Sequence, residues 1–83
     1  MAQYAAMHLA GFDVSLDDLK KFRQLHAKTA GHPEYGEIDG VETTTGPLGQ
    51  GVASGIGMAL GLKILNAKFK EADNEFIDSN VFI

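Results

Sequence analysis

Three histidines are the side chains with the most evident capacity for chemistry in this sequence. His32 stands between Gly31 and Pro33 in a stretch without helical or strand periodicity, so it does not serve the packing of a regular element. It could hydrogen-bond a ligand or be an ordinary loop residue, and both interpretations stay open. His8 belongs to a helical stripe and is interpreted as a packed or surface residue. His26 is interpreted as closing a helix, where it favours the negative end.

Carboxylates near His32 are a second possible source of chemistry, as metal ligands or as an acid and base pair. They are Glu34, Glu37, Asp39 and Glu42. Their spacing matches no metal-binding loop, so we interpret them as solvated. The chain has no cysteine, which excludes thiolate metal sites, and it shows no Ser/His/Asp arrangement. We therefore assign no metal-ligating residue.

A glycine-rich stretch, "TTTGPLGQGVASG" at residues 43–55, begins a segment that otherwise has the pattern of an apolar helix. Glycine and proline disfavour a helix interior, so a bare backbone here suggests a purpose beyond folding. Gly46, Pro47 and Leu48 mark the junction of loop and helix, where free N–H groups could meet an anion or a flat ring. An ordinary turn is the alternative. The later G-x-G-x-x-x-G spacing is only a weak echo of a dinucleotide fingerprint.

The elements that must position these residues are predicted from periodicity and capping signals. We expect helices at about residues 2–10, 16–25 and 48–69, separated by a long irregular loop at 26–45. Gly11 ends the first helix, Ser15 and Asp18 form a capping box at the second, and Pro47 suits the first position of the third. Small residues along the third helix predict close packing against another backbone: Gly49, Ala53, Gly57 and Gly61.

The last residues, Val81 to Ile83, have the pattern of a strand that is just beginning. Helices followed by such a strand indicate an α/β fold, of which residues 1–83 would form one mostly helical part.

Charge and hydropathy narrow the possible partners and the compartment. The net charge is −4, and no strong basic cluster is present, which argues against nucleic acid. The longest apolar run, residues 51–62, is too short to span a membrane, and the start does not have the pattern of a signal peptide. We expect a soluble, cytoplasmic protein.

Residues 19–62 carry a more specific signal, "LKKFRQLHAKTAGHPEYGEIDGVETTTGPLGQGVASGIGMALGL". The run G-H-P-E, then G-V-E, then T-T-G-P-L-G-Q-G closely resembles the N-terminal, thiamine-diphosphate-binding domain of transketolases. "YAAMHLAGFDVSLDD" before it and "SNVFI" after it extend the similarity to both ends. The resemblance implies a part of a three-layer α/β domain.

The same resemblance implies an activity and roles for individual residues. Transketolases move a two-carbon ketol unit from a ketose phosphate to an aldose phosphate in the pentose phosphate pathway, and the cofactor supplies the carbanion chemistry. His32 matches the active-site histidine that hydrogen-bonds the sugar donor. Gly46, Pro47 and Leu48 match the segment that lies against the cofactor. The resemblance also implies Mg²⁺ or Ca²⁺, held by residues absent from this chain, and a homodimer in the full enzyme.

Two other interpretations stay open beside an enzyme part that is inactive alone. The chain could be a non-catalytic piece, either a remnant or a subunit-interaction element that docks through its small-residue stripe. It could also be an independent anion-binding module that uses the helix beginning near Pro47.

Overall fold

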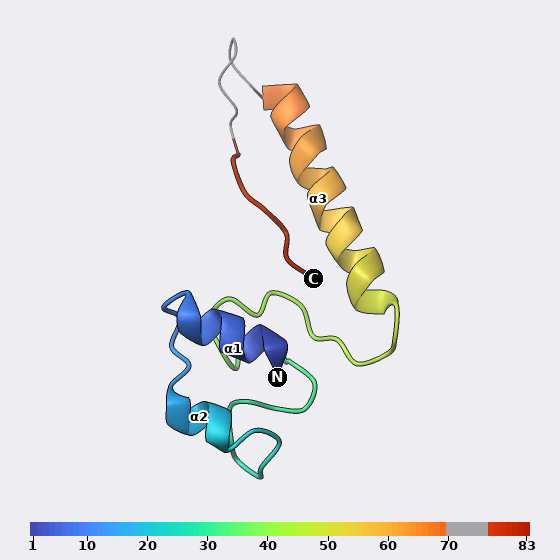
Figure 1. The fold of residues 1–83 in the computed structure, drawn as a ribbon. Helices are drawn as coiled ribbons and strands as arrows, with labels where there is room; N and C mark the ends of the chain where they lie inside the picture. The colour runs from blue at the N-terminus through green and yellow to red at the C-terminus, as the bar shows by residue number, and fades with distance from the viewer. Residues whose placement is uncertain (70–76) are drawn as a thin grey trace. The chain divides into compact units, whose positions relative to one another are not determined.

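The computed structural model describes residues 1–69 and 77–83 and divides into two units, Met1–Gly46 and Pro47–Ile83. The first unit holds α1 (Ala2–Leu9) and α2 (Leu16–Lys20), and the second holds α3 (Gln50–Phe69) (Figure 1). Helices are the only regular elements in these described ranges, in line with the mostly helical character expected. The strand expected from Val81 and the three-layer arrangement stay predictions.

The first unit is built on a small apolar core in which α1 and the long loop meet. Its buried members are Tyr4, Met7, Val14, Ile38 and Val41, with Leu19 and Phe22 packed against them. The rings of Tyr4 and Phe22 meet edge to face, with centroids 6.0 Å apart. Because Ile38 and Val41 lie in the long loop at 26–45, this loop contributes side chains to the core.

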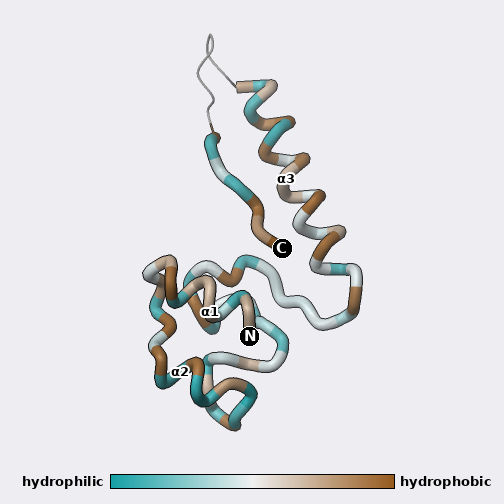
Figure 2. The backbone as a smooth tube through the Cα atoms, in the orientation of Figure 1, coloured by the Kyte–Doolittle hydropathy of each residue, from teal (hydrophilic) through white to brown (hydrophobic). Residues whose placement is uncertain are grey.

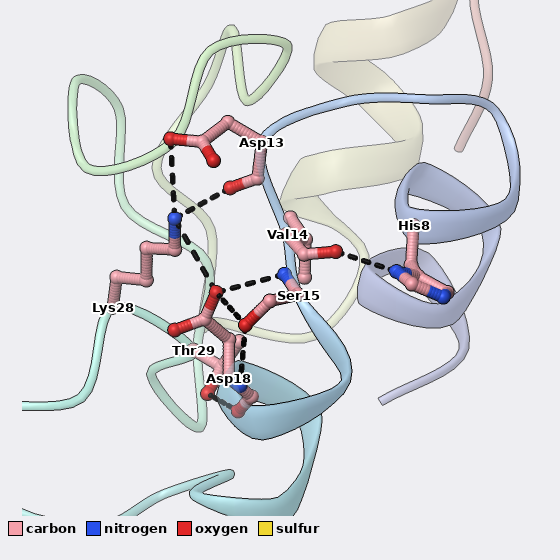
Figure 3. Close-up of polar contacts among 7 residues, drawn as sticks. All are labelled: His8, Asp13, Val14, Ser15, Asp18, Lys28 and Thr29. Atoms are coloured by element: carbon pink, nitrogen blue, oxygen red, sulfur yellow. Dashed lines mark hydrogen bonds and ion pairs between the residues drawn. The ribbon is translucent and has the colours of Figure 1, made fainter.

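Two of the helix-end signals read from the sequence, at Gly11 and at the capping box, are confirmed. Gly11 follows α1 with φ +90°, the left-handed conformation that glycine adopts without penalty. At α2, the Ser15 hydroxyl accepts the Asp18 N–H at 3.1 Å, and the Asp18 carboxylate accepts the Ser15 N–H at 2.8 Å (Figure 3). These bonds complete the capping box.

The capping carboxylate is also one end of an ion-pair network. Lys28 lies 3.4 Å from Asp18 and 3.3 Å from Asp13, and its ammonium donates to the Asp13 carbonyl (Figure 3). Partial burial favours neutral Lys28, but the bonds to Asp13 and Asp18 outweigh it and raise the Lys28 pKa. The hydrogen bonds from Ser15, helped by Lys28, lower the Asp18 pKa below its ordinary value of 3.8.

The predicted length of the second helix, 16–25, is wrong, because α2 ends at Lys20. Arg23 and His26 have positive φ values of 65° and 62°, which no α-helix allows. The Arg23 N–H donates instead to the Thr29 carbonyl at 2.9 Å, and the buried Thr29 hydroxyl donates to the Asp18 carbonyl at 2.7 Å. Tertiary hydrogen bonds thus replace the next helical turn, and His26 does not close a helix.

The lowered pKa of Asp18 predicts a pH-dependent contribution to stability. Because the folded pKa lies below the unfolded value, the capping box stabilises the chain above about pH 4, and this is lost as pH falls through the folded pKa. Asp18→Asn should therefore lower the melting temperature near neutral pH, and the difference from wild type should shrink in acid. Asp17→Asn is the control, since its carboxylate is exposed and 3.8 Å from Lys20. A difference that is constant with pH would contradict the assignment.

α3 begins at Gln50, two residues later than predicted, and Pro47 does not occupy its first position. The Gln50 N–H donates to the Pro47 carbonyl at 3.3 Å, and Gly49 has φ +88°, so residues 47–49 form a turn ahead of the helix. A left-handed residue interrupts helical geometry, which explains the later start.

Residues 77–83 run back along α3 and are fixed at two points. The side chain of Asn66, which is 8% exposed, donates to the Ile77 carbonyl and accepts the Ile77 N–H, both at 2.6 Å. Further along, Gly55 is buried, and a Cβ there would lie 2.6 Å from Ile83 and 3.6 Å from Val81. The Asn66 side chain therefore satisfies both backbone hydrogen-bonding groups of Ile77. The absence of a side chain at Gly55 leaves space for Val81 and Ile83.

Asn66→Ala should release residues 77–83 from α3. Two hydrogen bonds are lost and the Ile77 amide is left unpaired, so the stability of this attachment should fall by about 1–3 kcal/mol. The measurement is hydrogen exchange at the Ile77 amide, with Asn80→Ala as an exposed control in the same segment. Unchanged exchange at Ile77 in Asn66→Ala would show that other contacts hold the segment.

Hydrophobic residues occur along the whole length of α3 (Figure 2). Many of them are exposed, among them Ile56, Leu60 and Ile64. Within the described residues, no atom lies within 4 Å of a Cβ placed at Gly57 or Gly61. The close packing expected of the small-residue stripe therefore stays a prediction.

Candidate functional site

The loop that follows Ala30 folds back so that residues 33–35 lie beside residues 44–45. The Thr45 N–H donates to the Pro33 carbonyl at 3.4 Å, and the Tyr35 N–H donates to the Thr44 hydroxyl at 2.9 Å. Polar residues of the threonine run thus supply the partners that this irregular backbone needs. The result is that two segments about ten residues apart in sequence run side by side.

This pairing brings together two of the predicted site residues, His32 and Gly46. A Cβ placed on Gly46 would lie 3.6 Å from both Cδ2 and Cγ of the His32 ring, an ordinary van der Waals distance. The backbone of Gly46 is not in the left-handed region, so this glycine is not needed for its φ. Its missing side chain instead leaves the partly exposed backbone of Gly46 next to an imidazole.

His32 is the histidine that the fold leaves available. Its side chain is exposed, the ring atoms nearest to Gly46 are carbons, and no residue in the described ranges hydrogen-bonds either ring nitrogen. His8, in contrast, uses Nδ1 to donate to the Val14 carbonyl at 2.6 Å (Figure 3). A carbonyl only accepts, so this bond fixes the His8 tautomer, and His8 serves the structure.

The loop beneath His32 is anchored at its far end by the core. Ile38 and Val41 are 5% and 4% exposed, and the Val41 N–H donates to the Ile38 carbonyl at 3.1 Å. Gly40 between them has φ +101°, and a Cβ there would lie 2.5 Å from the Phe12 ring. Only glycine allows this turn to approach the Phe12 ring so closely.

The carboxylates of the loop do not form a cluster. Glu34, Glu37, Asp39 and Glu42 are all exposed, as expected for solvated side chains. Among the described residues, no group of three or more histidine or carboxylate side chains is placed to hold a metal ion.

Pro47 and Leu48 belong to the second unit, whereas His32 and Gly46 belong to the first. The turn at residues 47–49 leaves Leu48 completely exposed. An apolar side chain without a packing partner in its own unit can lie against a flat apolar ring. Of the three cofactor-binding candidates, Pro47 and Leu48 are exposed and Gly46 is partly exposed. The roles predicted for them and for His32 stay predictions.

One residue next to this site gave no sequence signal of its role. The hydroxyl of Tyr4 in α1 donates to the carbonyl of Ala30 at 2.7 Å, two residues before His32. The sequence pattern predicts only that Tyr4 lies in a helix, because a contact across 26 residues leaves no local spacing to read.

No helix within the described ranges is both long and apolar enough to cross a membrane.

Comparison with known proteins identifies the family of the chain. The family described as "Transketolase, thiamine diphosphate binding domain" matches residues 1–83. Similar relatives include transketolase 1 of Aliivibrio fischeri and transketolase of Buchnera aphidicola, both 54% identical over all 83 residues, and transketolase 1 of Vibrio parahaemolyticus at 53%. The chain spans 12% of the length of each relative. The chain therefore belongs to the transketolase family and matches its thiamine-diphosphate-binding domain.

Proposed function

We propose that this chain supplies one wall of a transketolase active site, in which a two-carbon ketol unit passes from a ketose phosphate to an aldose phosphate. The observation that carries the proposal is the placement of His32 against Gly46. It puts an exposed imidazole, which has no hydrogen-bond partner among the described residues, beside the partly exposed backbone of Gly46. The proposed reaction comes from family membership, since the relatives are named transketolases. The reaction belongs to the pentose phosphate pathway.

The proposed role of His32 is to orient the sugar donor. A ketose presents several hydroxyls, and an imidazole can accept a hydrogen bond from one of them and donate to another. Because the ring carbons lie toward Gly46, both nitrogens are left for substrate. Fixing a flexible sugar in one orientation lowers the entropic part of the reaction barrier.

The proposed role of Gly46, Pro47 and Leu48 is to support thiamine diphosphate. The residues fit the group, because the Gly46 backbone is not covered by a side chain of its own and Leu48 is fully exposed. When bound, thiamine diphosphate supplies the carbanion chemistry of the transfer. Leu48 would lie against its ring system, and a side chain on Gly46 would occupy space that it needs.

A divalent ion, Mg²⁺ or Ca²⁺, belongs to the proposed enzyme but not to the described part of this chain. No group of ligating side chains is placed for it among residues 1–69 and 77–83. We propose, as the family resemblance implies, that its ligands lie in the remainder of a transketolase chain and that the complete enzyme is a cytoplasmic homodimer. The 83 residues alone are expected to show no ketose-to-aldose transfer.

The test is a chimera in which these 83 residues replace the matching stretch of Aliivibrio fischeri transketolase 1. At 54% identity the replacement preserves the loop and helix pattern, so the chimera should catalyse transfer with thiamine diphosphate and Mg²⁺. A folded chimera that binds thiamine diphosphate but transfers nothing would refute the proposal. The unchanged A. fischeri enzyme, measured beside it, gives the reference rate.

A further inference from the structure

Tyr4 is a buried polar side chain that the proposed reaction does not use. It is 1% exposed, and its ring packs against Phe22 in the core of the first unit. Its hydroxyl reaches out of that core to the Ala30 carbonyl, 2.7 Å away. A buried hydroxyl needs a partner, but a partner 26 residues away ties two segments together.

The phenol of Tyr4 is a neutral donor under ordinary conditions. Burial raises its pKa above the usual 10.0, and the nearby charge of Glu34 raises it further. The hydroxyl therefore keeps its proton, and the carbonyl of Ala30, which can only accept, is held throughout the physiological range.

His32 lies between this bond and a second one. Ala30 precedes it by two residues, and the Pro33 carbonyl directly after it accepts the Thr45 N–H at 3.4 Å. At Gly31, between Ala30 and His32, a Cβ would lie 3.0 Å from Nε of Arg23, so an arginine side chain packs there as well. The backbone that carries His32 is thus restrained on both sides. The hydrogen bond from Tyr4, at 2.7 Å, is shorter than the one from Thr45, at 3.4 Å.

We propose that Tyr4 is a positioning residue for His32, holding the loop so that the imidazole stays beside Gly46. The importance of Tyr4 for catalysis rests on the proposed function, but its effect on the position of the His32 ring does not. Core packing by itself needs only the aromatic ring of Tyr4, which phenylalanine would supply. The hydroxyl is the part that acts on the loop.

The test is Tyr4→Phe in the 83-residue chain, measured by hydrogen exchange and NMR without cofactor. Loss of the bond at Ala30 should speed exchange at the Thr45 amide roughly two- to tenfold. The ring resonances of His32 should shift. Exchange at the Leu19 amide, which donates to the Ser15 carbonyl in the first turn of α2, and the His8 resonances should stay unchanged. A purely structural role would instead speed exchange at Thr45 and Leu19 equally.

Tyr35→Phe is the matched control, because it removes the same atom from an exposed ring in the same loop. It should leave Thr45 exchange and His32 resonances as they are. Unchanged Thr45 exchange and His32 resonances in folded Tyr4→Phe would overturn the proposal.

A second measurement serves if Tyr4→Phe does not fold. The chain has two tyrosines, so in Tyr35→Phe biosynthetic 3-fluorotyrosine labels Tyr4 alone. Fluorine makes the phenol a stronger donor while preserving its shape. The Gly31 amide and the His32 ring resonances should then shift, and unshifted His32 resonances would overturn the proposal. Because coenzyme and sugar are absent, these results are independent of whether the chimera catalyses transfer.

Discussion

Gly46→Val in the chimera is expected to weaken binding of thiamine diphosphate roughly 5- to 150-fold, the range that corresponds to an overpacking penalty of about 1–3 kcal/mol. The fold itself should tolerate the change. Gly46 is not in the left-handed region, and its new Cβ would meet the His32 ring at 3.6 Å, an ordinary contact. The added methyl groups instead occupy surface that the proposal assigns to the coenzyme. The measurement is a titration of thiamine diphosphate with Mg²⁺ in excess.

Gly46→Ala and Gly57→Ala are the graded controls for this variant. Alanine at position 46 adds one carbon at a distance the fold accepts, so its effect should lie between those of glycine and valine. Gly57 is in α3, and apart from the helix's own backbone no atom of residues 1–69 or 77–83 lies within 4 Å of an added Cβ, so alanine there should leave coenzyme binding unchanged. Full coenzyme affinity in Gly46→Val would mean that this backbone does not face the coenzyme.

Gly40→Ala is expected to lower the free energy of unfolding of the first unit by about 2–5 kcal/mol. Two effects combine: an alanine held at φ +101° costs about 1–3 kcal/mol, and its Cβ would lie 2.5 Å from Phe12 and 3.2 Å from Met7. A unit of this size has a total stability of only roughly 2–7 kcal/mol, so a large fraction of Gly40→Ala should be unfolded at 37 °C. Thermal denaturation followed by circular dichroism measures the loss.

Gly36→Ala separates the two effects. Gly36 lies in the same loop with φ +91°, but beyond its chain neighbours no atom in the described part of the chain lies within 4 Å of its added Cβ. It should therefore show the backbone penalty alone, and Gly40→Ala should be clearly less stable. Equal melting temperatures for the two variants would contradict the close approach of residue 40 to Phe12.

Local signals predicted those parts of the fold that local chemistry decides. The capping box of Ser15 and Asp18 and the left-handed Gly11 were both predictable, because each depends on residues within one turn of a helix. The same reasoning failed at the end of α2, where apolar spacing predicted a helix to Leu25. The Arg23 amide bonds to Thr29 instead, and no spacing rule reveals a tertiary hydrogen bond.

In the candidate site, too, local sequence signals predicted the residues but not the tertiary contacts between them. Its residues came from a motif that was specific enough to identify the family, but their spacing alone left His32 and the turn after Gly46 undecided. The contact of His32 with Gly46 depends on loop hydrogen bonds at Thr44 and Thr45. These are side-chain and backbone pairings between segments of irregular structure, which periodicity does not encode.

The most direct test of the account compares donor use and coenzyme binding in the chimera that carries His32→Ala. If the imidazole faces the sugar, kcat/KM for the ketose donor should fall roughly tenfold or more, because hydrogen bonds to substrate hydroxyls are lost. The dissociation constant of thiamine diphosphate should stay near that of the unchanged chimera. Equal loss of donor use and coenzyme affinity, or loss of coenzyme affinity alone, would contradict the assignment of His32 to the substrate side of the site.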